Sequence, residues 1–128
     1  MRLFLVRHAH SDPGDPDELR QLSSKGRRQA RQLGERLAEL ELDVVLSSPL
    51  LRARETAAAI AKATGAELRV VDRLAPGATA DDVLALVEGS RAPVVAVGHQ
   101  PDCSEIAVAL SGRDPGFPPA GVAELEVN

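Results

Sequence analysis

Aromatic residues are almost absent from this sequence of 128 residues, which contains no tryptophan, no tyrosine and two phenylalanines. The core must therefore be built from aliphatic side chains, and 44% of the residues are hydrophobic. The lack of tryptophan and tyrosine also removes the rings on which single-stranded nucleic acids stack. Nonspecific binding to nucleic acid depends on an excess of lysine and arginine, whereas the formal net charge here is −4. We expect no nucleic-acid partner.

Cysteine and long apolar runs are equally scarce. Cys103 is the only cysteine, which excludes an intramolecular disulfide and a cysteine-rich metal site. No stretch approaches the roughly 20 apolar residues that a membrane-spanning helix needs. The apolar start at residues 3–6 is too short for a signal peptide. We therefore expect a cytoplasmic protein without a membrane partner, in which residues 1–128 form one domain.

Short apolar segments, typical of buried strands, are spread along the chain. They predict strands at residues 2–7, 43–47, 67–72 and 93–98. A fifth strand is predicted at residues 122–127, where apolar and acidic residues alternate with period two, as expected at the edge of a sheet.

Helical patterns lie between these strands. Apolar residues spaced three and four positions apart predict two helices, whose buried faces are formed by Ala30, Leu33, Leu37 and Leu40 and by Leu50, Ala53, Ala57 and Ile60. Thr79 and Asp82 resemble a capping box that opens a third helix, which ends at Glu88. Pro101 opens a fourth helix, which ends before Gly112.

Strand and helix thus alternate through most of the chain, which is the pattern of a sheet covered by helices on both faces. We predict an α/β fold with three layers, α/β/α, around a mostly parallel five-stranded sheet with one antiparallel edge strand. Residues 11–21, 75–80 and 113–119 are rich in glycine, proline or charge, and they are predicted to be flexible loops.

Basic and imidazole side chains follow three of the predicted strands. Arg7 and His8 end the first strand, and His99 follows the fourth. The carboxyl ends of parallel strands meet at one edge of the sheet, where ligands of open α/β folds bind. With Ser48 as N-cap, Arg52 lies about one turn into a helix, where a cation is unfavourable unless an anion is bound. We therefore predict a phosphate site that contains both arginines and both histidines.

Each residue also has an ordinary structural explanation. Arg52 could form a surface ion pair with Glu55. His8 and His99 could each be a hydrogen-bonded structural histidine. Their joint occurrence at strand ends, together with two arginines, favours a functional role.

The residues that follow His8 leave open a second function, that of a metal-dependent hydrolase. His10, Ser11 and Asp12 are expected to be accessory residues near the site. His8, His10 and His99 could together hold a metal ion, as in a metal-dependent hydrolase. The arginines would be surplus in such a site, so we expect no metal and no other cofactor.

Several motifs resemble those of the histidine phosphatase superfamily, which includes the phosphoglycerate mutases. Arg7-His8-Ala9 resembles its Arg-His-Gly signature, and Val97-Gly98-His99 resembles its second-histidine motif. Residues 46–57 resemble its second phosphate-pocket motif, and residues 22–30 are similar to its first helix. The short chain is similar to the compact SixA-type phosphohistidine phosphatases. Two departures are Ala9, where the family has glycine, and residues 72–77, which contain no glutamate where larger members carry a catalytic one.

The resemblance implies that His8 is a nucleophile, kept neutral by nearby cations, and that Arg7, Arg52 and His99 stabilise the phosphoryl group. It implies hydrolysis of phosphohistidine on a protein, or of a related activated phosphomonoester, through a phosphohistidine intermediate. Without a dedicated acid, the site suits a P–N bond better than an alkyl ester, because imidazole departs more readily than an alkoxide. A phosphatase for small phosphorylated molecules and a noncatalytic phosphohistidine-binding module remain alternatives.

Overall fold

A five-stranded sheet forms the middle layer of the structure, a computed structural model that describes residues 1–127. The strand order is β3-β2-β4-β1-β5. The four parallel strands are β1 (Arg2–Arg7), β2 (Val44–Ser47), β3 (Leu68–Val70) and β4 (Val94–Gly98). β5 (Val122–Glu126) is antiparallel to β1 at one edge. The predicted mixed α/β sheet is therefore confirmed.

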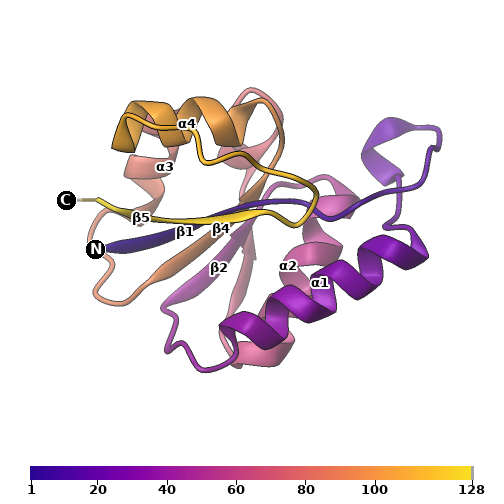
Figure 1. Cartoon of the computed structure of the whole chain (residues 1–128), viewed down its shortest axis with the longest axis horizontal. Helices are drawn as coiled ribbons and strands as arrows, with labels where there is room; N and C mark the ends of the chain where they lie inside the picture. The colour runs from indigo at the N-terminus through magenta and orange to yellow at the C-terminus, as the bar shows by residue number, and fades with distance from the viewer. Residues whose placement is uncertain (128) are drawn as a thin grey trace.

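Helices cover both faces of this sheet (Figure 1). α1 (Ser24–Leu37) and α2 (Leu51–Thr64) lie on one face, and α3 (Ala80–Val87) and α4 (Asp102–Ser111) lie on the other. Two short 3-10 helices, η1 (Asp17–Leu19) and η2 (Asp72–Leu74), lie in the connections. None of the helices in residues 1–127 is long and apolar enough to cross a membrane.

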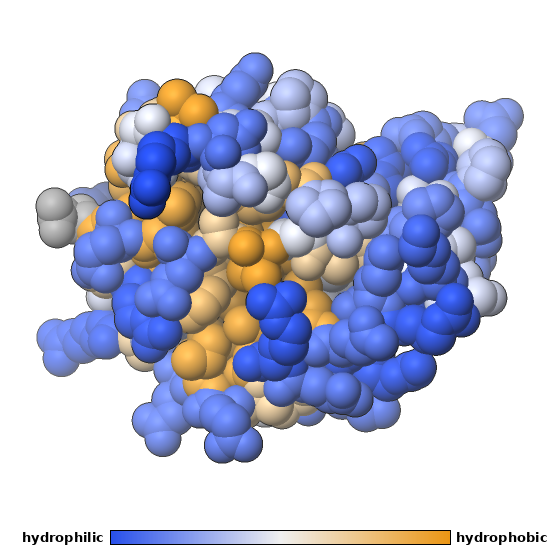
Figure 2. Space-filling view, in the orientation of Figure 1, coloured by the Kyte–Doolittle hydropathy of each residue, from blue (hydrophilic) through white to orange (hydrophobic). Residues whose placement is uncertain are grey.

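Alternation along the strands divides the core into two clusters. In β1, Leu3 and Leu5 pack with α3 and α4, whereas Phe4 and Val6 pack with α1 and α2. Successive side chains of a strand point to opposite faces, so a strand covered on both sides is apolar throughout. Figure 2 shows apolar side chains on the surface between strand β5 and helix α1. The end of the molecule that carries η1 is hydrophilic in the same view.

Several predicted helix ends are confirmed. The capping box of Thr79 and Asp82 is present at the start of α3, with both reciprocal bonds formed. α4 ends at Ser111, before Gly112 as predicted, and the φ of 80° at Gly112 is readily adopted only by glycine.

Several boundaries differ from the prediction, among them the end of α1, which lies before Leu40. Asp72 does not belong to β3, which ends at Val70, but begins η2. Ser48 is not the N-cap of α2: that position is Leu50, without a side-chain cap bond, and the helix begins at Leu51. The hydroxyl of Ser48 accepts from the Leu50 amide at 3.2 Å, so it caps a turn before the helix.

Candidate active site

His8 lies directly after β1, where its backbone amide donates to the carbonyl of Gly98 in the neighbouring strand β4. Its ring Nδ1 lies 2.7 Å from the carbonyl oxygen of Ala9. Because a carbonyl can only accept, Nδ1 carries the proton of the neutral ring and Nε2 carries the lone pair. Among residues 1–127, no group forms a hydrogen bond with this Nε2. The backbone thus fixes the tautomer that a nucleophilic imidazole requires.

The surroundings of His8 also keep the ring neutral. Burial lowers the pKa of His8 to about 4, and the positive charges of Arg52, Arg7 and Arg20 act in the same direction. The hydrogen bond to the Ala9 carbonyl opposes this shift. The expectation that cations keep the imidazole unprotonated is therefore correct in direction, although burial is the larger cause.

His99 lies beside His8, with the two ring centroids 5.3 Å apart and the ring planes tilted by 58°. It is buried, with 4% of its surface exposed, and its Nε2 lies 2.7 Å from the hydroxyl oxygen of Ser48. Burial lowers the pKa of His99 to about 4, with further lowering by the charges of His8 and Arg52, while Asp17 opposes it. Ser48 therefore orients His99 rather than capping α2, a role that the sequence analysis missed.

The two predicted arginines belong to the same cluster, since both charges act on His8. Arg7 donates from Nη1 to the carbonyl of Phe117 at 2.9 Å. Arg52 lies in the first turn of α2, as expected, and is 8% exposed. Its Nη1 donates to the backbone carbonyl of Asp17 at 2.9 Å, and its Nη2 donates to the Asp17 carboxylate at 3.2 Å. The contact with Asp17 connects α2 to η1.

Two polar atoms of this cluster are buried without a partner among residues 1–127: Nε of Arg7 and Nδ1 of His99. A buried polar group without a hydrogen bond costs about 1–3 kcal/mol, so such groups are rare and call for an explanation. Both belong to the residues predicted to bind a phosphoryl group. Unpaired polar atoms lower the stability of the protein, and their occurrence here is expected of a site that binds a ligand.

Thr56 ties the cluster together from α2. Its hydroxyl donates to the carbonyl of Arg52 at 2.9 Å and accepts from the backbone amide of Ala9 at 3.0 Å. The side chain is fully buried. It therefore joins the turn that carries Arg52 to the residue that follows His8, and the sequence pattern gave no sign of this role.

The predicted accessory residues lie outside the imidazole pair. His10 is exposed, and its Nδ1 lies 2.6 Å from the hydroxyl of Ser23 at the start of α1. Ser11 and Asp12 instead contact Arg20, which donates to the Ser11 hydroxyl and to the Asp12 carbonyl, each at 2.9 Å. No three His, Cys, Asp or Glu side chains within residues 1–127 are grouped to hold a metal ion. The grouping of His8, His10 and His99 is therefore wrong, because Ser23 holds His10 away.

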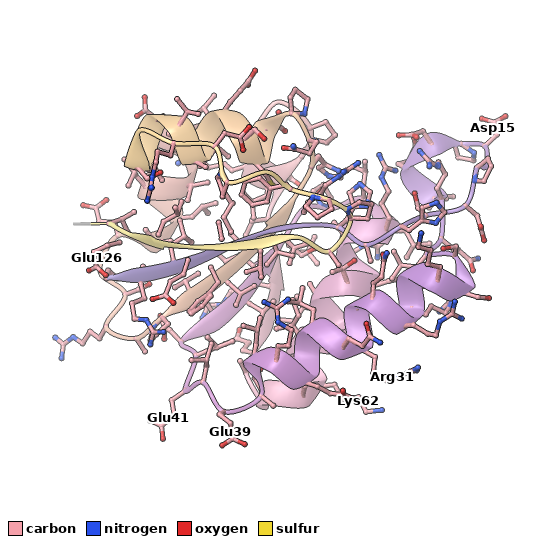
Figure 3. The ribbon with its side chains drawn as sticks, viewed as in Figure 1. Asp15, Arg31, Glu39, Glu41, Lys62 and Glu126 are labelled. Carbon is pink, nitrogen blue, oxygen red and sulfur yellow. The ribbon has the colours of Figure 1, made fainter. Side chains whose placement is uncertain are left out.

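The loop of residues 11–22 is held in place at several points. Ser11 and Leu22 form an antiparallel bridge, and Asp12 donates from its amide to the Gln21 carbonyl. Asp15 marks the tip of the loop and points away from the sheet (Figure 3). The segment predicted to be a flexible loop thus has defined hydrogen bonds and carries η1.

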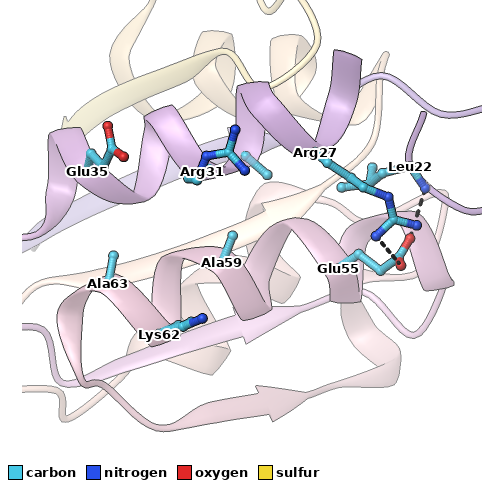
Figure 4. Close-up of a pocket in the computed structure, with 9 residues that line it drawn as sticks. Leu22, Arg27, Arg31, Glu35, Glu55, Ala59, Lys62 and Ala63 are labelled. Carbon is cyan, nitrogen blue, oxygen red and sulfur yellow. Dashed lines mark hydrogen bonds and ion pairs between the residues drawn. The ribbon is translucent and has the colours of Figure 1, made fainter. Parts of the chain in front are cut away.

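A groove of about 460 Å³ between α1 and α2 lies apart from this cluster (Figure 4). Inside it, Arg27 forms an ion pair with Glu55 at 3.6 Å, and the other Glu55 oxygen accepts from the Leu22 amide at 2.8 Å. The alternative interpretation of Arg52, an ion pair with Glu55, is therefore wrong, since Glu55 has these partners instead.

The lowered pKa values of His8 and His99 predict a loss of stability in mild acid. Well above pH 6.5 both rings are neutral in the folded and unfolded states, so they contribute little pH dependence there. As the pH falls from about 6.5 towards 4, the unfolded chain binds protons that the folded chain does not, and the free energy of unfolding decreases. Urea unfolding at pH 7.5, 6 and 5 should show this decrease, before carboxylates begin to titrate.

The variant His99→Gln is the control for this prediction. It removes one of the two groups whose pKa is lowered in the folded state, so its free energy of unfolding should change less over the same pH interval. Parallel pH dependence in the variant and the wild type would contradict the assignment.

Comparison with known proteins agrees with this geometry. Residues 3–76 match the family model described as "Histidine phosphatase superfamily (branch 1)". An uncharacterized protein of Picosynechococcus sp. is 36% identical over 125 residues, which cover 87% of this chain and 73% of the relative. Phosphoserine phosphatase 1 of Hydrogenobacter thermophilus is 40% identical over 83 residues. That match covers 58% of this chain and 37% of the relative's length.

Solved structures share the whole fold. The protein histidine phosphatase SixA, complexed with tungstate, superposes with a TM-score of 0.89 at 23% identity, covering 100% of this chain and 89% of that one. A structure assigned as the phosphohistidine phosphatase SixA of Agrobacterium tumefaciens gives a TM-score of 0.84 at 28% identity, covering 98% and 90%. The chain belongs to the histidine phosphatase superfamily, and its fold is of the SixA type.

Proposed function

We propose that this protein hydrolyses phosphohistidine on another protein through a covalent intermediate on His8. The observation that carries the proposal is the His8 tautomer, in which the Ala9 carbonyl holds the proton at Nδ1 and leaves Nε2 as the nucleophile. Membership of the histidine phosphatase superfamily supports phosphatase activity. The likeness to proteins described as phosphohistidine phosphatases supports the choice of substrate.

In the first step, Nε2 of His8 attacks phosphorus and the leaving group departs from the opposite side. Arg7, Arg52 and His99 stabilise charge on the phosphoryl oxygens, which is most of what such a site must do. In the second step, water attacks the phosphohistidine on His8 and releases phosphate. No cofactor is required by this scheme.

Trapping the intermediate tests this proposal. The wild-type protein, mixed briefly with a radiolabelled phosphodonor and quenched in alkali, should retain label that is stable in alkali and lost in acid, as a P–N bond is. Digestion should place the label on the peptide that contains His8. Label on a peptide that lacks His8, or turnover without any labelled protein at the earliest quench times, would contradict the proposal.

A small-molecule phosphomonoesterase is the second candidate, because one relative, 40% identical over 83 residues, is named phosphoserine phosphatase 1. The two candidates differ in the leaving group, an alkoxide in phosphoserine and an imidazole in phosphohistidine. Initial rates on free phosphoserine and on a phosphohistidine-containing protein separate them. We expect the higher kcat/KM on the phosphoprotein.

A further inference from the structure

Asp17 brings a carboxylate to the positively charged cluster. Its Oδ2 accepts from Nη2 of Arg52 at 3.2 Å, and its Oδ1 accepts from Nη1 of Arg20 at 3.0 Å. The hydrogen bond from Arg20, followed by that from Arg52, lowers the pKa of the Asp17 carboxyl, so it is ionised at neutral pH. The side chain is 61% exposed, whereas that of Arg52 is 9% exposed. The carboxylate therefore lies on the solvent side of the buried guanidinium.

Asp17 also acts on the reacting groups. Its negative charge raises the pKa of His99, against the larger lowering by burial. Arg52, which holds it, lowers the pKa of both His8 and His99. The Asp17 carboxylate is thus electrostatically coupled to the place where the phosphoryl group would be transferred.

The contact with Asp17 leaves Arg52 able to bind phosphate. A guanidinium has five N–H donors in a planar fork, and Asp17 uses two of them. The others remain for phosphoryl oxygens. In an in-line displacement the leaving group lies opposite the nucleophile. Because His8 is partly buried at the end of β1, we infer that the leaving group lies towards solvent. The exposed Asp17 side chain, which contacts Arg52, is the carboxylate of this cluster that also faces solvent.

The Asp17 carboxylate can assist the cleavage of phosphohistidine through the protonation state of the substrate ring. One ring nitrogen of the substrate is bonded to phosphorus, and the other, distal nitrogen can take up a proton. If the distal nitrogen is unprotonated, cleavage of the P–N bond releases imidazolate, a strong base and a poor leaving group. If it is protonated, cleavage releases neutral imidazole. A neighbouring carboxylate favours the protonated ring, because a charge-assisted hydrogen bond is about twice as strong as a neutral one.

We propose that Asp17 accepts a hydrogen bond from the protonated distal nitrogen of the substrate imidazole and so favours phosphohistidine over phosphate esters; this rests on the proposed function. As the bond from His8 Nε2 to phosphorus forms, the P–N bond of the substrate breaks and its electron pair returns to the ring nitrogen. The distal nitrogen keeps the proton that it took from solvent, so neutral imidazole leaves. Asp17 stays ionised throughout, and no carboxylic acid is needed at residues 72–77.

The variant Asp17→Asn tests this inference with two substrates, a phosphohistidine peptide and p-nitrophenyl phosphate. Loss of the charge should lower kcat/KM for the peptide by about 10- to 100-fold at pH 8. The loss should be smaller at pH 6, where more of the substrate ring is already protonated. Activity on the aryl phosphate should fall much less than activity on the peptide, since nitrophenolate leaves as an anion without a proton and the backbone carbonyl of residue 17 still accepts from Nη1 of Arg52. Glu18→Gln, in the same turn η1, is the matched control.

The outcomes separate this inference from the function on which it rests. Equal losses on both substrates, independent of pH, would mean that Asp17 only orients Arg52, and would overturn the inference. An unchanged rate on the phosphohistidine peptide in Asp17→Asn would overturn it while leaving the proposed function intact. A wild-type protein that hydrolyses the aryl phosphate but not the peptide would overturn the proposed substrate, and the inference with it.

Discussion

Replacement of His8 by alanine should lower kcat/KM on any phosphorylated substrate by at least about 10⁴-fold, because it removes the atom that forms the bond to phosphorus. The arginines and His99 would remain, so binding of the substrate should weaken much less than turnover. Steady-state kinetics together with equilibrium binding of inorganic phosphate would separate the two effects.

His10→Ala is the matched control for this prediction, since it removes an imidazole two positions away whose ring contacts Ser23 rather than His99. We expect a change in kcat/KM of less than about threefold. A His8→Ala protein that is folded and retains a tenth of the wild-type rate would exclude His8 as the nucleophile.

Replacement of Gly26 by alanine should have the largest effect on stability. A Cβ atom at this position of α1 would lie 1.9 Å from the carbonyl oxygen of His10, which is backbone and cannot rotate away. The helix or the segment after β1 would have to move, at a cost of about 3 kcal/mol or more in the free energy of unfolding. Tm should fall by roughly 10 °C, as measured by circular dichroism.

The same substitution links the fold to the candidate site. The His10 carbonyl that would be displaced also accepts from the amide of Ser23, which is the N-cap of α1. A shift there would disturb the chain two residues after His8. Arg28→Ala, an exposed position of the same helix, should change stability by no more than about 0.5 kcal/mol. A Gly26→Ala protein as stable as this control would show that α1 does not approach the strand end closely.

The cluster of Arg7, His8, Arg52 and His99 could be predicted because it depends on local patterns and one topological rule. Apolar runs located the strands, and parallel strands bring their carboxyl ends to a common edge of the sheet. Residues that follow different strands are therefore brought together, however far apart they lie in the sequence. The capping box at Thr79 and the glycine that ends α4 were predictable for the same reason, since each is determined within one turn of the chain.

The roles of Asp17 and Ser48 were decided only by the tertiary structure. Asp17 reaches Arg52 across 35 positions of sequence, from a loop whose course depends on Arg20, Ser11 and Leu22. Ser48 has the residue type and position of an N-cap, yet α2 begins later, and its hydroxyl contacts His99 from a neighbouring strand. The amino-acid sequence by itself determined which residues meet at the edge of the sheet. The tertiary structure decided which donor pairs with which acceptor. These contacts join segments that lie far apart in the sequence, and no local periodicity encodes them.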